Sequence, residues 1–445
     1  TQRPDSAHCH GADLRETAQL KALADAAWHR WGQLDGLVNN LLADYLVLDL
    51  CNDKGLLCGK ILADLGADVL IIENPEGNPA RTQPPFYKDI PHTERSLSWF
   101  YFCSNKRGIT LDIAREDGKE IFKTLVRKAS FVVESFHAGY MDEIGLGYTM
   151  LSQINPSLIM ISITPFGSKG PYCDFQASDL ILEGMGGLMS VSGDSDRAPL
   201  RCTTEQWHLG AVDAAMAALA AHYYRGNTGR GQYIDVSIQE SLLWGMQVYA
   251  FWEMTKTRYK REGDRTSRGN ISFKVIWKCS DGYISWRIFV AAMGRATKAL
   301  VEWMDEENMA GNLKETNWEN LDMNFLTQQD IKHWEELFAH FFLKHTKSEL
   351  QREAVKRGLM LFPVADAKDL IEEHQLKERH YWEEIAHNEL GDNLLYPGAF
   401  LKSDTGDLAI RMRAPLIGEH NEEVYVKELG IPREELLVLK QNGVI

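Results

Sequence analysis

The chain has 445 residues, of which 44% are hydrophobic and 25% are charged. This length is too great for one simple core, so we expect two or three folding units. The composition excludes a disordered or membrane-embedded chain. The formal net charge is −15, and the 48 Lys and Arg residues form no dense run. This balance argues against nucleic acid or an anionic membrane as the main partner.

The seven cysteines are an odd number and contain no CxxC pair. This pattern favours reduced thiols in a cytosol over a disulfide framework or a zinc site. The first residues, TQRPDSAHCHGADLRE, lack the apolar region of a signal peptide. No run of about eighteen apolar residues is present that would span a bilayer. We therefore expect a cytoplasmic protein without a metal site.

The first forty residues differ from the rest of the chain. We expect an Ala- and Leu-rich helix over residues 14–31 and a short apolar strand in LDGLVNN, residues 34–40. Residues 12–40 resemble a fragment of a short-chain dehydrogenase, but no Gly-rich dinucleotide turn precedes them and no Tyr-x-x-x-Lys pair follows. We interpret residues 1–40 as an appended or chimeric segment without oxidoreductase chemistry; the alternative is a coincidental amphipathic helix and edge strand.

From residue 45 onward, near-continuous apolar segments alternate with helical ones. Strands are expected at 45–50, 67–73, 108–113, 130–136, 157–167 and 233–238, and helices at 55–65, 115–129 and 208–225. This alternation predicts a parallel sheet covered on both faces, as in a Rossmann-like α/β domain. Further on we expect a charged linker at 255–270, a hairpin around Asp281-Gly282 and a mostly helical, smaller domain over 291–388.

Seven segments identify a family resemblance. They are VLDL, LADLGADVLIIENPEG, NKRGITLDI, VVESF-x-x-GYMDEIGLGY, NPSLIMISITPFGSKGPY, GRGQYIDVS and APLIGEHNEEVYVKELG. Their order over about 400 residues resembles that of the family III (CaiB/BaiF-type) CoA-transferases, and KGLLCGKILADLGADV is most similar to the branch of succinyl-CoA:benzylsuccinate CoA-transferase subunits.

The resemblance implies a Rossmann-like large domain built from both ends of the chain, a smaller inserted α+β domain, and an interlocked dimer. We place an appended segment at 1–40, the CoA-binding large domain at 41–240, linkers and the small domain at 241–405, and a return to the large domain at 406–445. The resemblance also implies transfer of CoA from an acyl-CoA donor to a carboxylic acid acceptor. The CoA thioester is the substrate, and no cofactor is tightly bound.

In the family, a nucleophilic Asp forms an acyl anhydride and then an enzyme-CoA thioester. It stands about 22 residues before the Gly of the GRGQ turn, and that count from Gly229 reaches Trp207. Three alternatives remain open. In the first, Glu205 takes the role, because a Glu can form the same anhydride. In the second, the chain is the non-catalytic, CoA-binding half of a heteromer whose partner is an Asp-bearing homologue. In the third, it is catalytically silent in CoA transfer and binds acyl-CoA for another purpose, such as intramolecular transfer, isomerisation or regulation. His208 is a candidate general base, with a structural role as the alternative, and we expect Asp179 to cap the helix that follows it.

Further site residues follow from the family motifs. The resemblance places Asn105, Lys106 and Arg107 close to CoA, and the cations suit its phosphates, although a solvated turn is an equal alternative. Three more residues are implied to lie beside the pantetheine: Ser135, Phe136 and Gly139. Ser135 replaces the usual Asn, and Glu143 replaces an Arg that contacts CoA.

Overall fold

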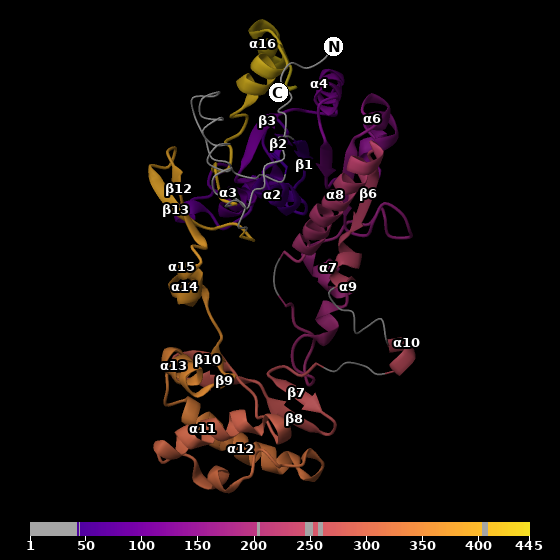
Figure 1. The fold of residues 1–445 in the computed structure, drawn as a ribbon. Helices are drawn as coiled ribbons and strands as arrows, with labels where there is room; N and C mark the ends of the chain where they lie inside the picture. Colours follow the sequence, from indigo (N-terminus) through magenta and orange to yellow (C-terminus); the bar gives the residue numbers. More distant parts are fainter. Residues whose placement is uncertain (1–41, 44, 203–204, 245–251, 257–260, 403–407) are drawn as a thin grey trace, which may run out of the picture.

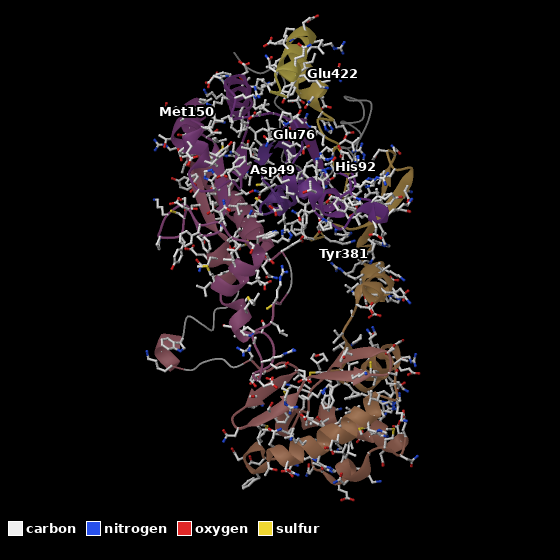
Figure 2. The ribbon with its side chains drawn as sticks, turned by 180° about the vertical axis from the view of Figure 1, so that it is seen from behind. Asp49, Glu76, His92, Met150, Tyr381 and Glu422 are labelled. Atoms are coloured by element: carbon white, nitrogen blue, oxygen red, sulfur yellow. The ribbon has the colours of Figure 1, made fainter. Side chains whose placement is uncertain are left out.

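The computed structural model describes residues 42–43, 45–202, 205–244, 252–256, 261–402 and 408–445 (Figure 1). The helix and strand expected within residues 14–40 lie outside these ranges. The described chain forms two bodies, one around a large sheet and one around the helices α11 and α12, joined by extended segments (Figure 1). Tyr381 lies on one of the joining segments (Figure 2).

A six-stranded sheet organises the first body. Its order is β3-β2-β1-β4-β5-β6, and all neighbouring strands are parallel. The prediction of a parallel sheet is therefore confirmed. The strands are β1 (Leu46–Leu50), β2 (Asp68–Glu73), β3 (Lys106–Thr110), β4 (Phe131–Glu134), β5 (Ile159–Thr164) and β6 (Tyr233–Ser237).

The position of β3 differs from the predicted 108–113. The strand begins at Lys106 because that side chain is neutralised inside the sheet by Asp49, with Nζ 2.8 Å from the carboxylate. The strand ends at Thr110. The N–H of Leu111 makes the last bond to β2, at the carbonyl of Glu73, and the N–H of Asp112 then donates to the carbonyl of Val444 instead. In the sequence, two adjacent cations before an apolar segment are typical of a turn. Here Lys106 and Arg107 belong to the strand, because each forms an ion pair, with Asp49 and Asp68 respectively.

Two separate apolar cores cover the two faces of this sheet. On one face, Val47, Val69 and Val133 pack with α2 (Leu56–Asp64), α3 (Leu97–Cys103) and α8 (His208–Thr228). On the other, Leu48 and Leu70 pack with α4 (Glu116–Val126), α6 (Tyr148–Ile154) and α16 (Arg433–Gln441). The alternation of neighbouring β1 residues between the two cores explains why the strands are apolar throughout.

Residues 408–445 return to the sheet at β3. The Asn105 side chain bonds the backbone of Ala409, Arg411 and Met412. Further along β3, the hydroxyl of Tyr425 donates to the carbonyl of Thr110 at 2.6 Å. These bonds join residues that are 304 to 315 positions apart in the sequence, so the first body is built from both halves of the chain.

The second body has its own aromatic core, which includes Trp277, Trp286 and Phe338. Its strands are β7 (Arg265–Arg268), β8 (Ile271–Lys274), β9 (Ile276–Cys279), β10 (Gly282–Ser285) and β11 (Phe362–Pro363), and its helices include α11 (Gly294–Glu306), α12 (Gln328–Phe342) and α13 (Lys347–Arg357). The predicted hairpin is confirmed as β9–β10, with Ser280 and Asp281 between the strands. Its aromatic residues Trp277 and Trp286 are core residues, whereas Tyr283 is exposed.

Two expectations for this half of the chain are wrong. Part of the expected charged linker is β7, because its residues pair with β8. The helical region does not extend to 388, since β12 (Trp382–His387) and β13 (Asp392–Pro397) form a hairpin closed by Gly391 at φ 65°. The remaining elements are α5 (Tyr140–Glu143), α7 (Asp179–Met185), α9 (Ile238–Trp244), α10 (Trp252–Thr255), α14 (Ala367–Glu372), α15 (His374–Glu378), the π-helix η8 (Glu422–Glu428) and short 3-10 turns η1 (Pro79–Thr82), η2 (Tyr87–Asp89), η3 (Leu188–Val191), η5 (Ala291–Met293), η6 (Gly311–Glu315) and η7 (Met323–Phe325).

Within the described ranges, no helix combines the length and apolar character needed to cross a membrane.

Candidate active site

The strand order reverses between β1 and β4, and polar groups meet at that point. Parallel α/β sheets bind ligands at the carboxyl ends of their strands where the order reverses. Asn52, just after β1, donates its backbone N–H to the hydroxyl of Ser135, just after β4, at 2.9 Å. That hydroxyl donates in turn to the amide oxygen of Asn52, also at 2.9 Å. These bonds fix the two loops that border the crevice.

A small cavity of about 20 Å³ adjoins the loop after β1 and brings three of the predicted residues together. Glu205, Trp207 and His208 line it from the start of α8. The opposite wall comes from the segments after β1 and β2 and from α3: Asp53, Leu56, Ala80, Gln83, Ser98 and Phe102. A carboxylate, an imidazole and an aromatic wall therefore share one hollow at the carboxyl edge of the sheet.

Glu205 has a strained backbone that its neighbours hold in place. Its φ is +65°, in the left-handed region that non-glycine residues rarely adopt. The buried Asp179 carboxylate accepts the backbone N–H of Glu205 at 2.9 Å and that of Gln206 at 2.5 Å. Arg201 pairs with the same carboxylate at 3.0 Å. Strain of this kind persists only where surrounding contacts determine it, and it is common at functional sites.

This geometry corrects the expectation for Asp179. The N-cap residue of α7 is Ser178, and Asp179 is the first residue of the helix. Its carboxylate bonds the loop before α8 instead of its own helix, because that loop presents two neighbouring N–H groups. Sequence reasoning missed this contact because the bonded residues are 26 and 27 positions apart.

His208 contacts the Glu205 side chain directly. Its Nε2 lies 3.2 Å from Oε2 of Glu205. Because a carboxylate only accepts, Nε2 carries the proton in this bond. Burial lowers the pKa of His208, while the Glu205 carboxylate opposes that shift. The ring is therefore mainly neutral at pH 7, and its buried Nδ1 has no partner among the described residues.

Trp207 occupies the position expected for Asp and precedes the first residue of α8. Its indole lacks a nucleophilic oxygen, and its Nε1 is buried without a hydrogen-bond partner in the described chain. The side chain of Glu205 is 42% exposed, so solvent reaches its carboxylate. Asp213 lies further along α8 and does not line the cavity. Two carboxylates line the cavity, Glu205 and Asp53; Asp53 lies 3.8 Å from the ammonium of Lys54, whereas Glu205 is two residues from the position expected for the Asp.

The segment Asn105–Arg107 binds other parts of the protein. Lys106 is fully buried and bonds Asp49; burial alone would lower the pKa of Lys106, but the Asp49 carboxylate raises it. Arg107 pairs with carboxylates of Asp68, Glu423 and Glu428. These partners favour a structural role for the three side chains over contact with a phosphate, so CoA binding by Asn105, Lys106 and Arg107 stays an untested prediction.

The segment Ser135–Gly139 lies at the crevice. Gly139 has φ +84°, which a side chain would disfavour, and begins the single turn of α5. Glu134 precedes the segment; burial raises its pKa to about 7, although Ser162 and the N–H of Phe136 bond the carboxylate. The contact of Ser135, Phe136 and Gly139 with pantetheine stays a prediction. Among the described residues, no group of three or more His, Cys, Asp and Glu side chains is arranged to hold a metal.

Comparisons with known proteins identify the family. The model of "CoA-transferase family III" matches residues 42–421. The chain is 31% identical to succinyl-CoA:(R)-benzylsuccinate CoA-transferase subunit BbsE of Thauera aromatica, over 90% of this chain and 97% of that one. It is 32% identical to formyl-CoA:oxalate CoA-transferase of Streptomyces avermitilis, over 90% and 98%.

A solved structure is also similar. It is a CaiB/BaiF family protein from Brucella suis, with a TM-score of 0.73 and 26% identity over 86% of this chain and 98% of that one. The mixed α/β fold with a central six-stranded parallel sheet agrees with this likeness. Since the family model covers residues 42–421, the resemblance found in the sequence is confirmed, and this chain belongs to CoA-transferase family III.

Proposed function

We propose that the chain transfers CoA from an acyl-CoA donor to a carboxylic acid acceptor, with Glu205 as the nucleophile. Relatives named as CoA-transferases support the reaction class. The observation that carries the proposal is the strained, partly exposed Glu205, held by Asp179 and bonded to His208 inside the cavity. Its placement fits a carboxylate that must attack a bound thioester.

The chemistry uses the carboxylate twice. An oxygen of Glu205 attacks the donor thioester carbon, the C–S bond breaks, and a mixed anhydride and CoA thiolate form. The thiolate attacks the glutamyl carbonyl, releases the donor acid and leaves a glutamyl-CoA thioester. The acceptor carboxylate then attacks this thioester, giving a new anhydride and CoA thiolate. Attack of that thiolate on the acceptor carbonyl yields the product acyl-CoA and restores Glu205.

The neutral His208 has a positioning role in this scheme. Its Nε2–H orients the carboxylate without adding a full positive charge, which would make Glu205 a poorer nucleophile. The indole of Trp207 and the ring of Phe102 reduce access of water to the anhydride, which water would otherwise hydrolyse. Phe102 also packs on the His208 ring, with 4.5 Å between the ring centroids.

In a second candidate function, the chain is one subunit of a heteromeric enzyme whose other subunit is an Asp-bearing homologue. In that enzyme the chain either takes part in catalysis or only binds CoA. BbsE, a relative at 31% identity, is itself named a subunit. In addition, α8 carries an exposed apolar stripe at helical spacing, Leu209, Val212, Met216 and Tyr223, that fits an interface with another chain. The same stripe supports the homodimer, interlocked or otherwise, that the first candidate implies.

One experiment separates the candidates. The isolated chain is incubated with succinyl-CoA and then with hydroxylamine, which converts a glutamyl anhydride or thioester to a hydroxamate. A hydroxamate at Glu205, absent from Glu205→Gln and retained in the control Asp213→Asn, is the result expected for the nucleophile. No hydroxamate in the isolated chain, with transfer only after an Asp-bearing homologue is added, would establish the heteromer instead.

A further inference from the structure

The connection between α7 and α8, which carries Glu205, is also bonded to the segment that enters the second body. This connection reaches from the sheet body toward β7 (Figure 1). The backbone N–H of Gly263, two residues before β7, donates to the carbonyl of Gly193 in the connection at 3.1 Å. A hollow of about 510 Å³ lies beside this contact and is lined by residues of both segments. The two bodies therefore meet at a defined place.

Arg261 makes two further bonds at this junction. Its Nε donates to the carbonyl of Asp194 at 3.1 Å, and its Nη2 donates to the carbonyl of Arg197 at 2.7 Å. Both bonds are charge-assisted, so they are stronger than bonds between neutral groups. The side chains of Asp194 and Arg197 pair with each other at 2.7 Å. One guanidinium thus holds a short loop that is also closed by its own ion pair.

The loop at 192–200 fits closely against the segment that contains Arg261. A Cβ on Gly263, where φ is +58°, would lie 1.8 Å from a carboxylate oxygen of Asp194. The ends of the loop are joined as well, because the N–H of Leu200 donates to the carbonyl of Ser192 at 3.1 Å. A movement of the loop at Asp194 is therefore transmitted to the residue that follows Leu200.

That next residue, Arg201, begins the part of the connection that α7 holds. Arg201 pairs with Asp179 at 3.0 Å, through the carboxylate oxygen that also accepts the N–H of Glu205. The N–H of Cys202 donates to the buried carboxylate of Glu183 at 3.4 Å. Asp179 and Glu183 are four residues apart on α7, so they lie on the same face of the helix. Arg201, Cys202 and Glu205 are therefore held on α7, and the loop just before them is held by Arg261.

We propose that Arg261 is a positioning residue for Glu205, through which the second body sets the conformation of the loop that carries the nucleophile. The proposal rests on the proposed function, because only there is Glu205 the nucleophile. Glu205 has φ +65°, a conformation that persists only while surrounding contacts hold it. Without Arg261, the loop at 192–200 and Arg201 gain alternative conformations, and fewer molecules keep Glu205 in its strained one. The rate of anhydride formation falls in proportion to that fraction.

Arg261→Gln tests the coupling through two measurements on the full chain. A Gln side chain has no charge and one donor group, so it cannot replace both bonds to the loop. With succinyl-CoA and hydroxylamine, the maximal rate of hydroxamate formation at Glu205 should fall about tenfold, while the half-saturating concentration of succinyl-CoA changes less than about twofold. Hydrogen exchange of the Glu205 and Gln206 amides should accelerate by about the same tenfold factor.

Two further variants serve as rescue and control. Arg261→Lys keeps the positive charge but lacks the planar fork that reaches both carbonyls, so it should recover part of the rate and part of the exchange protection. Arg268→Gln removes an exposed arginine from β7 and should leave both measurements as in the wild type.

The contrary outcomes are specific. Unchanged exchange of the Glu205 and Gln206 amides in Arg261→Gln overturns the proposal. Equal acceleration of exchange in β1 and β4 would mean that the variant only weakens the fold, and the proposal would be wrong. A wild-type chain that forms no hydroxamate would reject Glu205 as the nucleophile, whereas faster exchange of its amide in Arg261→Gln alone would still support the coupling between the second body and this loop.

Discussion

Replacement of Asp179 by Asn tests whether the loop before α8 is held for catalysis. The carboxylate uses one oxygen for the N–H of Gln206 and the other for the N–H of Glu205 and for Arg201. An Asn side chain has one acceptor oxygen, so one backbone N–H is left facing an NH₂ group. Loss of that charge-assisted bond costs about 1.5–3 kcal/mol. The Arg201 pair adds less than about 1 kcal/mol, because the side chain of Arg201 is 45% exposed.

The expected total is about 3 kcal/mol, similar to or larger than the strain of about 1–3 kcal/mol stored at Glu205. The loop should therefore leave its left-handed conformation. Transfer should fall roughly 100-fold, since each 1.36 kcal/mol is a factor of ten in rate. Amide hydrogen exchange at Glu205 and Gln206 should accelerate by a similar factor, a measurement that does not depend on activity.

The matched control is Asp174→Asn, an exposed aspartate in the same segment before α7. It should change neither the transfer rate nor the exchange of the two amides. Thermal unfolding, recorded for both variants, separates a local effect from loss of the fold. If Asp179→Asn leaves the exchange of Glu205 and Gln206 within about threefold of the wild type, the argument that Asp179 holds this loop is wrong.

Three further perturbations follow from the structure. Burial raises the pKa of Glu134 to about 7, with Asp235 adding to the shift and His137 opposing it, so the stabilisation by the protonated carboxyl is complete below about pH 4.5 and is lost as pH rises through 7. Glu134→Gln should remove about 3 kcal/mol of pH dependence from the free energy of unfolding in that window, measured by urea unfolding, and an unchanged profile would contradict this. Arg81→Leu leaves the buried Glu73 carboxylate unpaired and should cost about 3–5 kcal/mol in urea unfolding, with part of the loss recovered by adding Glu73→Met. Met216→Glu, at a side chain 55% exposed on the α8 stripe, should shift the chain from dimer to monomer in light scattering, whereas no change in mass would exclude the stripe as the interface.

Much of the fold was predictable because its signals are local. The sheet strands are apolar in sequence since both faces are covered, and the Ala-rich pattern of α8 reflects its close packing through Ala211 and Ala215. The hairpin β12–β13 was missed because WEEIAH contains strong helix formers, and its pairing with DNLLYP outweighs that preference.

The site was less predictable because its contacts are distant in sequence. The positions of Glu205, Trp207 and His208 followed from counting along α8, and the structure places all three in one cavity. The contact of Asp179 with the Glu205 loop has no local pattern. Lys106 has the sequence features of a ligand-binding cation, and only the fold places it against Asp49, 57 residues away.

The return of residues 408–445 to β3 has a consequence for the order of folding during synthesis. Asn105 and Thr110 bond earlier residues of the sheet body, but their partners Ala409 and Tyr425 are made 304 and 315 residues later. The aromatic body at 271–361 has local contacts and its own core, so it can fold on the emerging chain first. The sheet body must wait with the β3 edge incomplete. A ribosome stalled before residue 408 should therefore carry a folded aromatic body beside a protease-sensitive sheet body.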